Sequence, residues 1–118
     1  MEKFSVSLPL TGEYLTTVRL TTGGLCTLSG FDVDTAEDFK VCVTESLLIL
    51  KRNGYQRASI DFTVGEGLAC ALCGEEPFGE VEESIEAEIS KALLSALLGE
   101  VEFEKNPEGK VCKISFIG

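Results

Sequence analysis

The sequence of 118 residues contains no histidine. Without an imidazole, the chain cannot form a Ser-His-Asp or Cys-His catalytic group, or a zinc site with histidine ligands. No apolar run approaches the roughly 20 residues that a membrane-spanning helix needs. The first residues, MEKFSVSLPL, alternate like a strand and lack the pattern of a signal peptide. We therefore expect a cytoplasmic protein with no membrane partner.

Basic residues are also scarce. The chain has 10 Lys and Arg against 20 Asp and Glu, which gives a formal net charge of −10. Such a surface repels phosphate backbones, so we expect no nucleic-acid partner. The acidic surface is typical of an ordinary soluble protein, and it is also compatible with recruitment of a basic protein partner.

Cysteine is present in an odd number, and the five residues are scattered among mostly apolar neighbours. This pattern predicts free thiols that behave as small hydrophobic side chains. Cys70 and Cys73 form a CxxC pair, but they lie in a strand-like run, where residues three apart point to opposite faces. No second pair and no histidine could complete a zinc site, so we predict no metal. The cysteines are Cys26, Cys42, Cys70, Cys73 and Cys112.

The central feature of the sequence is a predicted helix over residues 34–53. Asp34 is the expected N-cap, with Glu37 three residues later in the spacing of a capping box. Asn53 and Gly54 are expected to end the helix, because both tolerate a left-handed conformation. Its apolar face recurs at three- and four-residue steps. That face comprises Phe39, Cys42, Val43, Leu47 and Leu50.

A second line of residues follows another side of this helix and is unusually apolar for a solvent face. Its one carboxylate, Glu45, has two interpretations: an ordinary residue that pairs with Lys40 or Arg52 or faces solvent, or a functional group in a cleft. The pair Leu48 and Ile49 also has two interpretations, as part of the core or as an exposed patch that binds a partner. The line comprises Val41, Glu45, Leu48, Ile49 and Arg52.

The rest of the chain predicts further helices and strands around this helix. Periodicity and turn residues indicate a strand at 3–8, a helix at 13–28 that is broken near Gly23-Gly24, and a hairpin of strands 57–64 and 67–72 around Gly65-Glu66-Gly67. A loop over 74–79 and a helix over 81–98 follow, and then strands 100–105 and 110–117. The predicted buried face of the later helix comprises Ile85, Ile89, Ala92, Leu93, Ala96 and Leu97.

The predicted order is therefore β-α-α-β-β-α-β-β in one domain. Two hairpins with helices between them favour a two-layer α/β (α+β) sandwich, in which helices cover one face of a mixed or antiparallel sheet. The chain is long enough for such a domain to bury a core.

Residues 36–46, AEDFKVCVTES, resemble the nucleotide-binding helix of the anti-sigma-factor serine kinases. These kinases are GHKL ATPases with the Bergerat nucleotide-binding fold. Val18-Arg19-Leu20, Gly30-Phe31 and the order of the C-terminal elements also match the family. The resemblance covers nearly the whole chain in order, although only residues 36–46 are specific. It implies a Bergerat-like fold and a single histidine-kinase-type ATPase-like domain over residues 1–118.

In that family, a motif Glu activates the attacking oxygen and an Asn four residues later holds Mg²⁺. Glu45 matches the Glu, but Ile49 stands at the Asn position, and neither it nor neighbouring Leu48 offers an oxygen to the cation. The family's Asp-x-Gly-x-Gly motif is also missing, since the corresponding segment 72–77 has Cys73 and Gly74 and no Asp. The segment up to Ser84 leaves little room for a lid, and the start of the later helix carries carboxylates that would repel a triphosphate.

These departures predict a degenerate nucleotide site whose former pocket is marked by Leu48, Ile49, Cys73 and Gly74. The first hypothesis is a non-catalytic regulator that needs no cofactor and binds a protein, such as a sigma factor or an anti-anti-sigma-like protein, with homodimerisation left open. The second is an ATP- and Mg²⁺-dependent serine protein kinase with a divergent site and Glu45 as its catalytic base. The third is an unrelated α/β scaffold.

Overall fold

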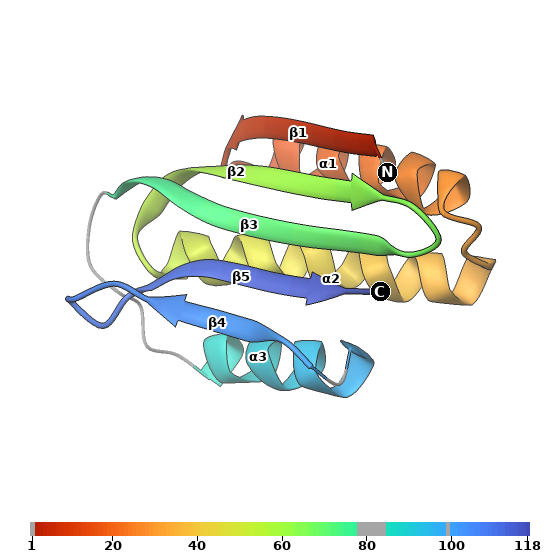
Figure 1. The fold of residues 1–118 in the computed structure, drawn as a ribbon. Coiled ribbons are helices and arrows are strands. Elements are labelled where there is room, and N and C mark those ends of the chain that lie inside the picture. The colour runs from red at the N-terminus through yellow and green to blue at the C-terminus, as the bar shows by residue number, and fades with distance from the viewer. Residues whose placement is uncertain (1, 78–84, 99) are drawn as a thin grey trace.

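The computed structural model describes residues 2–77, 85–98 and 100–118. The predicted order of helices and strands is confirmed (Figure 1). The elements are β1 (Glu2–Pro9), α1 (Gly12–Leu28), α2 (Val33–Arg52), β2 (Tyr55–Val64), β3 (Leu68–Pro77), α3 (Ile85–Leu98), β4 (Glu102–Lys105) and β5 (Val111–Ile117).

The five strands form one sheet in the order β1-β2-β3-β5-β4, and every pairing is antiparallel. The described helices all lie on one face of this sheet (Figure 1). This arrangement confirms the two-layer sandwich and selects the antiparallel alternative. None of the described helices has the length and apolar character needed to cross a membrane.

The core lies between α2 and the sheet. All five residues of the predicted apolar face of α2 are at most 1% exposed, and they pack with Ile60, Phe62, Leu72 and Ile114 from the strands. Burying one large aliphatic or aromatic side chain contributes about 1.5–3 kcal/mol. The apolar spacing of α2 therefore accounts for its place against the sheet.

The start of α2 differs from the prediction. The N-cap is Asp32, whose Oδ1 accepts the backbone N–H of Thr35 at 2.7 Å, whereas Asp34 lies in the first turn. The helix begins earlier because Phe31 packs edge-on against Phe39, with 5.7 Å between the ring centroids. Glu37 takes no part in a capping box with Asp34, and its carboxylate pairs with Lys40 at 2.6 Å.

The predicted end of α2 is confirmed. Gly54 follows the helix with a φ of +91°, in the left-handed region that a glycine cap supplies. The Asn53 side chain donates to the carbonyl of Ile49 at 2.7 Å and accepts the N–H of Val111 at 2.9 Å. This buried amide therefore ties the end of α2 to β5.

The predicted break in α1 is wrong, because the helix continues through Gly23 and Gly24. A methyl group at Gly23 would lie 3.4 Å from Cδ of Lys40, so this glycine lets α1 approach α2 closely. The buried hydroxyl of Thr22 donates to the carbonyl of Val18 at 2.8 Å, which satisfies it inside the helix. Contact with α2 thus outweighs the weak helix propensity of the two glycines.

The loop predicted at 74–79 is wrong for residues 74–77, which extend β3 opposite Tyr55 to Ala58 of β2. Residues 78 and 79 lie outside the described part of the chain, as do residues 81–84 of the later predicted helix.

The predicted buried face of α3 is wrong in part, although Leu97 packs against the core as expected. Ile89, Ala92 and Ala96 are exposed, while Ser90 and Leu94 are at most 3% exposed. Leu93 and Leu97 are half-buried, and the side chain of Ile85 lies outside the part of the chain that the structure describes. Relative to the prediction, α3 is rotated about its axis so that Ser90 faces α2. There its hydroxyl forms hydrogen bonds with Glu45 and Arg52.

We expect Asp32→Ala to lower the melting temperature at neutral pH and Asp34→Ala to lower it less. The Thr35 N–H holds the pKa of Asp32 below its ordinary value of 3.8. Its contribution is therefore present above that ordinary value and is lost as the pH falls through the lower pKa of the folded state. Thermal unfolding at several pH values should show the gap between wild type and Asp32→Ala closing in acid. A larger effect from Asp34→Ala would contradict the cap assignment.

Candidate functional site

Glu45 lies half-buried in the middle of α2, on the side that meets α3. Its Oε2 accepts a hydrogen bond of 2.6 Å from the hydroxyl of Ser90, which is only 3% exposed. The same hydroxyl oxygen accepts a 2.9 Å hydrogen bond from Nη1 of Arg52. Ser90 therefore links a carboxylate and a guanidinium that both belong to α2.

The partners that the sequence suggested for Glu45 do not contact it directly. Among the described residues, neither Lys40 nor Arg52 forms an ion pair with this carboxylate, since Lys40 pairs with Glu37 and Arg52 reaches it through Ser90. Hydrogen bonds to charged groups are shorter and stronger than those between neutral groups. The hydroxyl thus satisfies both charges where α3 partly excludes water.

Leu48 and Ile49 lie on the same side of α2. Ile49 is 1% exposed and Leu48 is half-buried, while α2 packs along α3. Burial places Ile49 in the core, the first of the two alternatives for this pair. A hydrocarbon side chain in this position has no atom that Mg²⁺ would coordinate.

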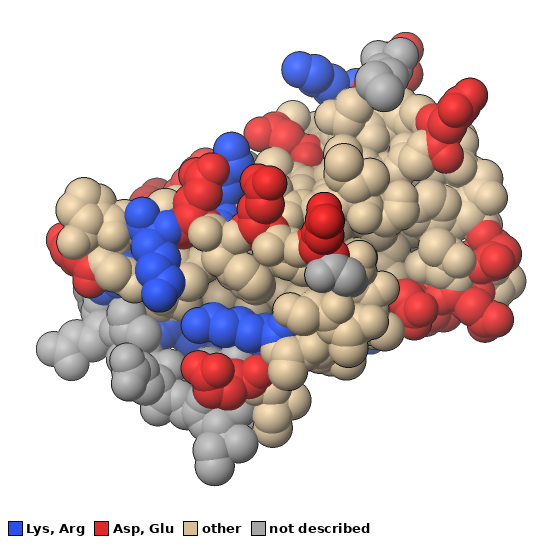
Figure 2. All heavy atoms as spheres, turned by 60° about the horizontal axis from the view of Figure 1, so that its bottom comes forward, with Lys and Arg blue, Asp and Glu red and all other residues tan. Residues whose placement is uncertain are grey.

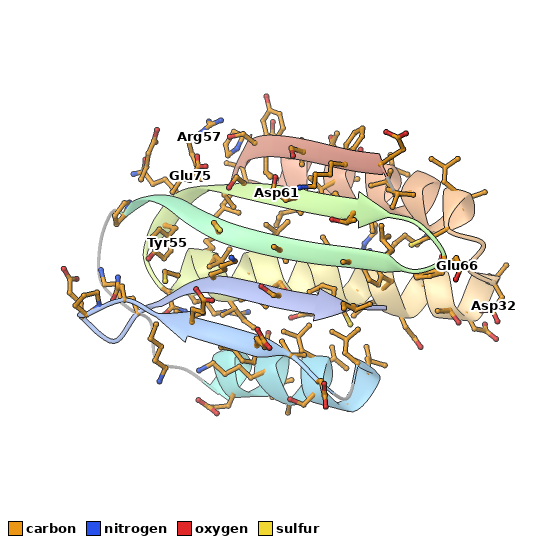
Figure 3. The ribbon with its side chains drawn as sticks, in the orientation of Figure 1. Asp32, Tyr55, Arg57, Asp61, Glu66 and Glu75 are labelled. Carbon is orange, nitrogen blue, oxygen red and sulfur yellow. The ribbon has the colours of Figure 1, made fainter. Side chains whose placement is uncertain are left out.

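Gly74 lies in β3 opposite the buried Ala58, on the face of the sheet that the helices cover. A methyl group on Gly74 would come within 2.5 Å of the Tyr55 ring, so the ring lies directly over the glycine. Tyr55, at the start of β2, is itself only 6% exposed (Figure 3). The space above this end of β3 is therefore filled by an aromatic side chain.

The positions predicted to mark the nucleotide pocket do not form one cluster. Cys73 precedes Gly74 in the strand, so its side chain points to the other face of the sheet. Ile49 is buried in the helix layer, and Gly74 is covered by Tyr55.

The prediction of five free cysteines is confirmed, with Cys26, Cys42 and Cys70 buried and the other two partly so. Cys70 and Cys73 face opposite sides of β3, as the alternation predicted. Burial, with the charges of Asp38 and Glu45, raises the pKa of Cys42 to about 12, and burial raises the pKa of Cys70 well above its ordinary value. Both thiols stay protonated at neutral pH and are therefore poor nucleophiles.

Comparisons with known proteins agree with the family resemblance of the sequence. No model of a known protein family matches the sequence. The serine-protein kinases RsbW of Bacillus mycoides (strain KBAB4) and Bacillus cereus (strain B4264) are each 30% identical to the chain over 67 residues. RsbW of Bacillus thuringiensis (strain Al Hakam) is 28% identical over the same length. The chain is similar to the serine-protein kinases RsbW. The match covers 57% of this chain and 42% of those relatives, so it spans less than half of their length.

The sequence alone does not predict two residues that shape this candidate site. The apolar periodicity of the later helix favours Ile89 and Leu93 over Ser90. The spacing of Ser90, Leu94 and Leu98 is the signal that marks the side turned inward. Tyr55 was missed because its contact with Gly74 depends on how β2 pairs with β3. No local pattern signals that contact.

We expect Gly74→Ala to destabilise the fold by about 1–3 kcal/mol, because the added methyl group overlaps the Tyr55 ring. Gly24→Ala is the matched control, since nothing lies within 4 Å of a methyl group there and alanine favours a helix. Urea unfolding of both variants measures the difference. A Gly74→Ala variant as stable as the wild type would contradict the placement of Tyr55.

Proposed function

We propose that this protein is a non-catalytic regulator of the anti-sigma-factor type, which acts by binding another protein and has lost a working nucleotide site. The observation that carries the proposal is the hydrogen bond between Glu45 and Ser90. It occupies the carboxylate that the resemblance assigns to catalysis with a residue of the protein's own α3. The similarity to RsbW and the Bergerat-like arrangement of helices on one face of a sheet support the family assignment.

Loss of nucleotide chemistry is supported by the residues at the expected site. Phosphoryl transfer depends on positioning and on neutralising charge with metal ions and cations. Ile49 supplies no metal ligand, and the ring of Tyr55 lies over Gly74. These residues do not fit Mg-ATP, so we propose that the protein works without a nucleotide cofactor.

The proposed partner is a sigma factor or an anti-anti-sigma-like protein in the cytoplasm. The net charge of −10 disfavours nucleic acid and favours a protein with a basic surface. A homodimer is compatible with this function, and the oligomeric state is measured in the experiment below.

The alternative is an ATP-dependent serine protein kinase with a divergent site. One observation favours it: Glu45 accepts a hydrogen bond of 2.6 Å from a serine hydroxyl, which is within the distance at which a general base acts. In that case Glu45 would be the catalytic residue, and α3 would have to leave it before a substrate serine could bind.

Mixing the purified protein with sigma factors and anti-anti-sigma-like proteins of the same genome tests these functions. Size-exclusion chromatography with light scattering should reveal a complex that forms without nucleotide. Radiolabelled ATP should transfer no phosphate to any of these proteins. Phosphate on a serine of a partner would contradict the proposal and establish the kinase alternative, and the absence of any complex would contradict regulation by binding to this class of partner.

Restoring the motif residue provides a second test. We expect Ile49→Asn to release no phosphate from ATP and to destabilise the fold by about 2–4 kcal/mol, because it buries an amide in place of a core side chain. Ile49→Val is the control and should cost about 0.5–1.5 kcal/mol. Phosphate release and urea unfolding measure the two effects. Hydrolysis of ATP by Ile49→Asn would mean that adenine and phosphate groups are still bound.

A further inference from the structure

The face of the sheet opposite the helices, called here the outer face, is covered by none of the described elements (Figure 1). Side chains in the middle of this face are small. In the middle strand β3 they are Ala69, Ala71 and Cys73, and Ser115 of β5 lies beside Ala71. Small residues across neighbouring strands leave the surface hollow at this point.

A groove of about 550 Å³ occupies this hollow. Its apolar part includes Ala69, Ala71 and Ile117, and it extends to Leu98 at the end of α3. Ile117 is 72% exposed although it is a large apolar residue at the end of the central sheet. An exposed apolar groove of this kind is typical of a surface that binds another molecule.

The charged side chains that line the groove all have one sign. They are the carboxylates of Asp61, Glu100 and Glu102, and the lining among the described residues includes no Lys or Arg. Asp61 projects from β2 and accepts a 2.6 Å hydrogen bond from the hydroxyl of Ser5, which holds its carboxylate in place (Figure 3). Figure 2, which turns the α3 and β4 side forward, shows carboxylates at several places on the surface and basic residues mostly towards one side.

We propose that this groove binds a basic segment of a partner protein. An aliphatic or aromatic side chain of that segment lies on Ala69 and Ala71, and Lys or Arg residues beside it meet Asp61 and Glu102. The proposal rests on the proposed function, since it assigns a surface and a chemistry to the protein partner. Complementary charge accelerates association and selects partners, so binding is sensitive to salt.

Charge also distinguishes this occupant from a second copy of the chain. Two grooves facing each other would bring carboxylates together, because the basic residues that point to the outer face, Lys3, Arg57 and Lys113, lie outside the groove lining. Like charges placed opposite each other oppose association. A basic segment instead neutralises the three carboxylates and covers the apolar surface in one step.

Fluorescence anisotropy with a labelled short peptide rich in lysine and leucine tests the proposal. We expect the peptide to bind, its affinity to fall as salt increases, and a matched peptide with glutamate for each lysine not to bind. The double variant Asp61→Asn, Glu102→Gln should weaken binding about tenfold, since it removes two exposed ion pairs with the peptide. The control Glu75→Gln, Glu76→Gln changes the net charge equally at exposed positions of β3 outside the lining.

Filling the groove gives a test that does not alter charge. Ala71→Leu should abolish peptide binding, whereas Ser59→Leu, on the outer face but outside the lining, should leave it unchanged. Circular dichroism verifies that both variants fold. Equal binding by Ala71→Leu and wild type, or equal losses in the two double variants, would overturn the proposal.

Two further results separate this proposal from the proposed function. Sigma-factor binding that persists in the groove variants, with no peptide binding, overturns the groove and leaves the proposed function standing. Peptide binding in the groove without any sigma-factor complex supports the groove and rejects the proposed partner class. A dimer that Ala71→Leu dissociates, again without peptide binding, assigns the face to a second copy and overturns the basic segment.

Discussion

The structure depends on the burial of α2, which packs against the sheet and lies between the other two helices. Phe39, Leu47 and Leu50 are at most 1% exposed, and α2 contacts α1, α3, β2, β3 and β5. Its ends are held by separate devices, the Asp32 cap and the Asn53 amide that reaches β5. Because α2 contacts both neighbouring helices and three of the strands, its position determines where those elements can lie.

The polar side of α2 then determines how α3 lies against it. Glu45 and Arg52 are half-buried, and a buried charged group that lacks a hydrogen-bond partner costs about 1–3 kcal/mol or more. Ser90 satisfies both groups, which turns Ile89 outward and Leu94 into the core. In our proposal this arrangement explains the loss of nucleotide chemistry, because the residues that a nucleotide would need are engaged in holding the fold together.

Most of the fold was predictable because many helices, strands and turns depend on residues that are close together in the sequence. The apolar spacing of α2, the Asn53-Gly54 end and the Gly65-Gly67 turn are examples. The Asp32 cap was not predictable, since a choice between two aspartates depends on where Phe31 packs. Glu45 was identified from its resemblance to a motif, but its partner Ser90 lies 45 residues away and becomes visible only when α3 is placed.

A thermal unfolding scan with and without millimolar Mg-ATP tests the central claim most directly. A ligand at about a hundred times its dissociation constant stabilises a protein by roughly 2.7 kcal/mol. For a domain of this size, that moves the midpoint by about 4 °C or more. In our proposal the protein binds no nucleotide, so we predict no shift. The proposal rests on the burial of Ile49, the Tyr55 ring over Gly74 and the hydrogen bond between Ser90 and Glu45. A shift of several degrees would contradict the account and favour an active kinase.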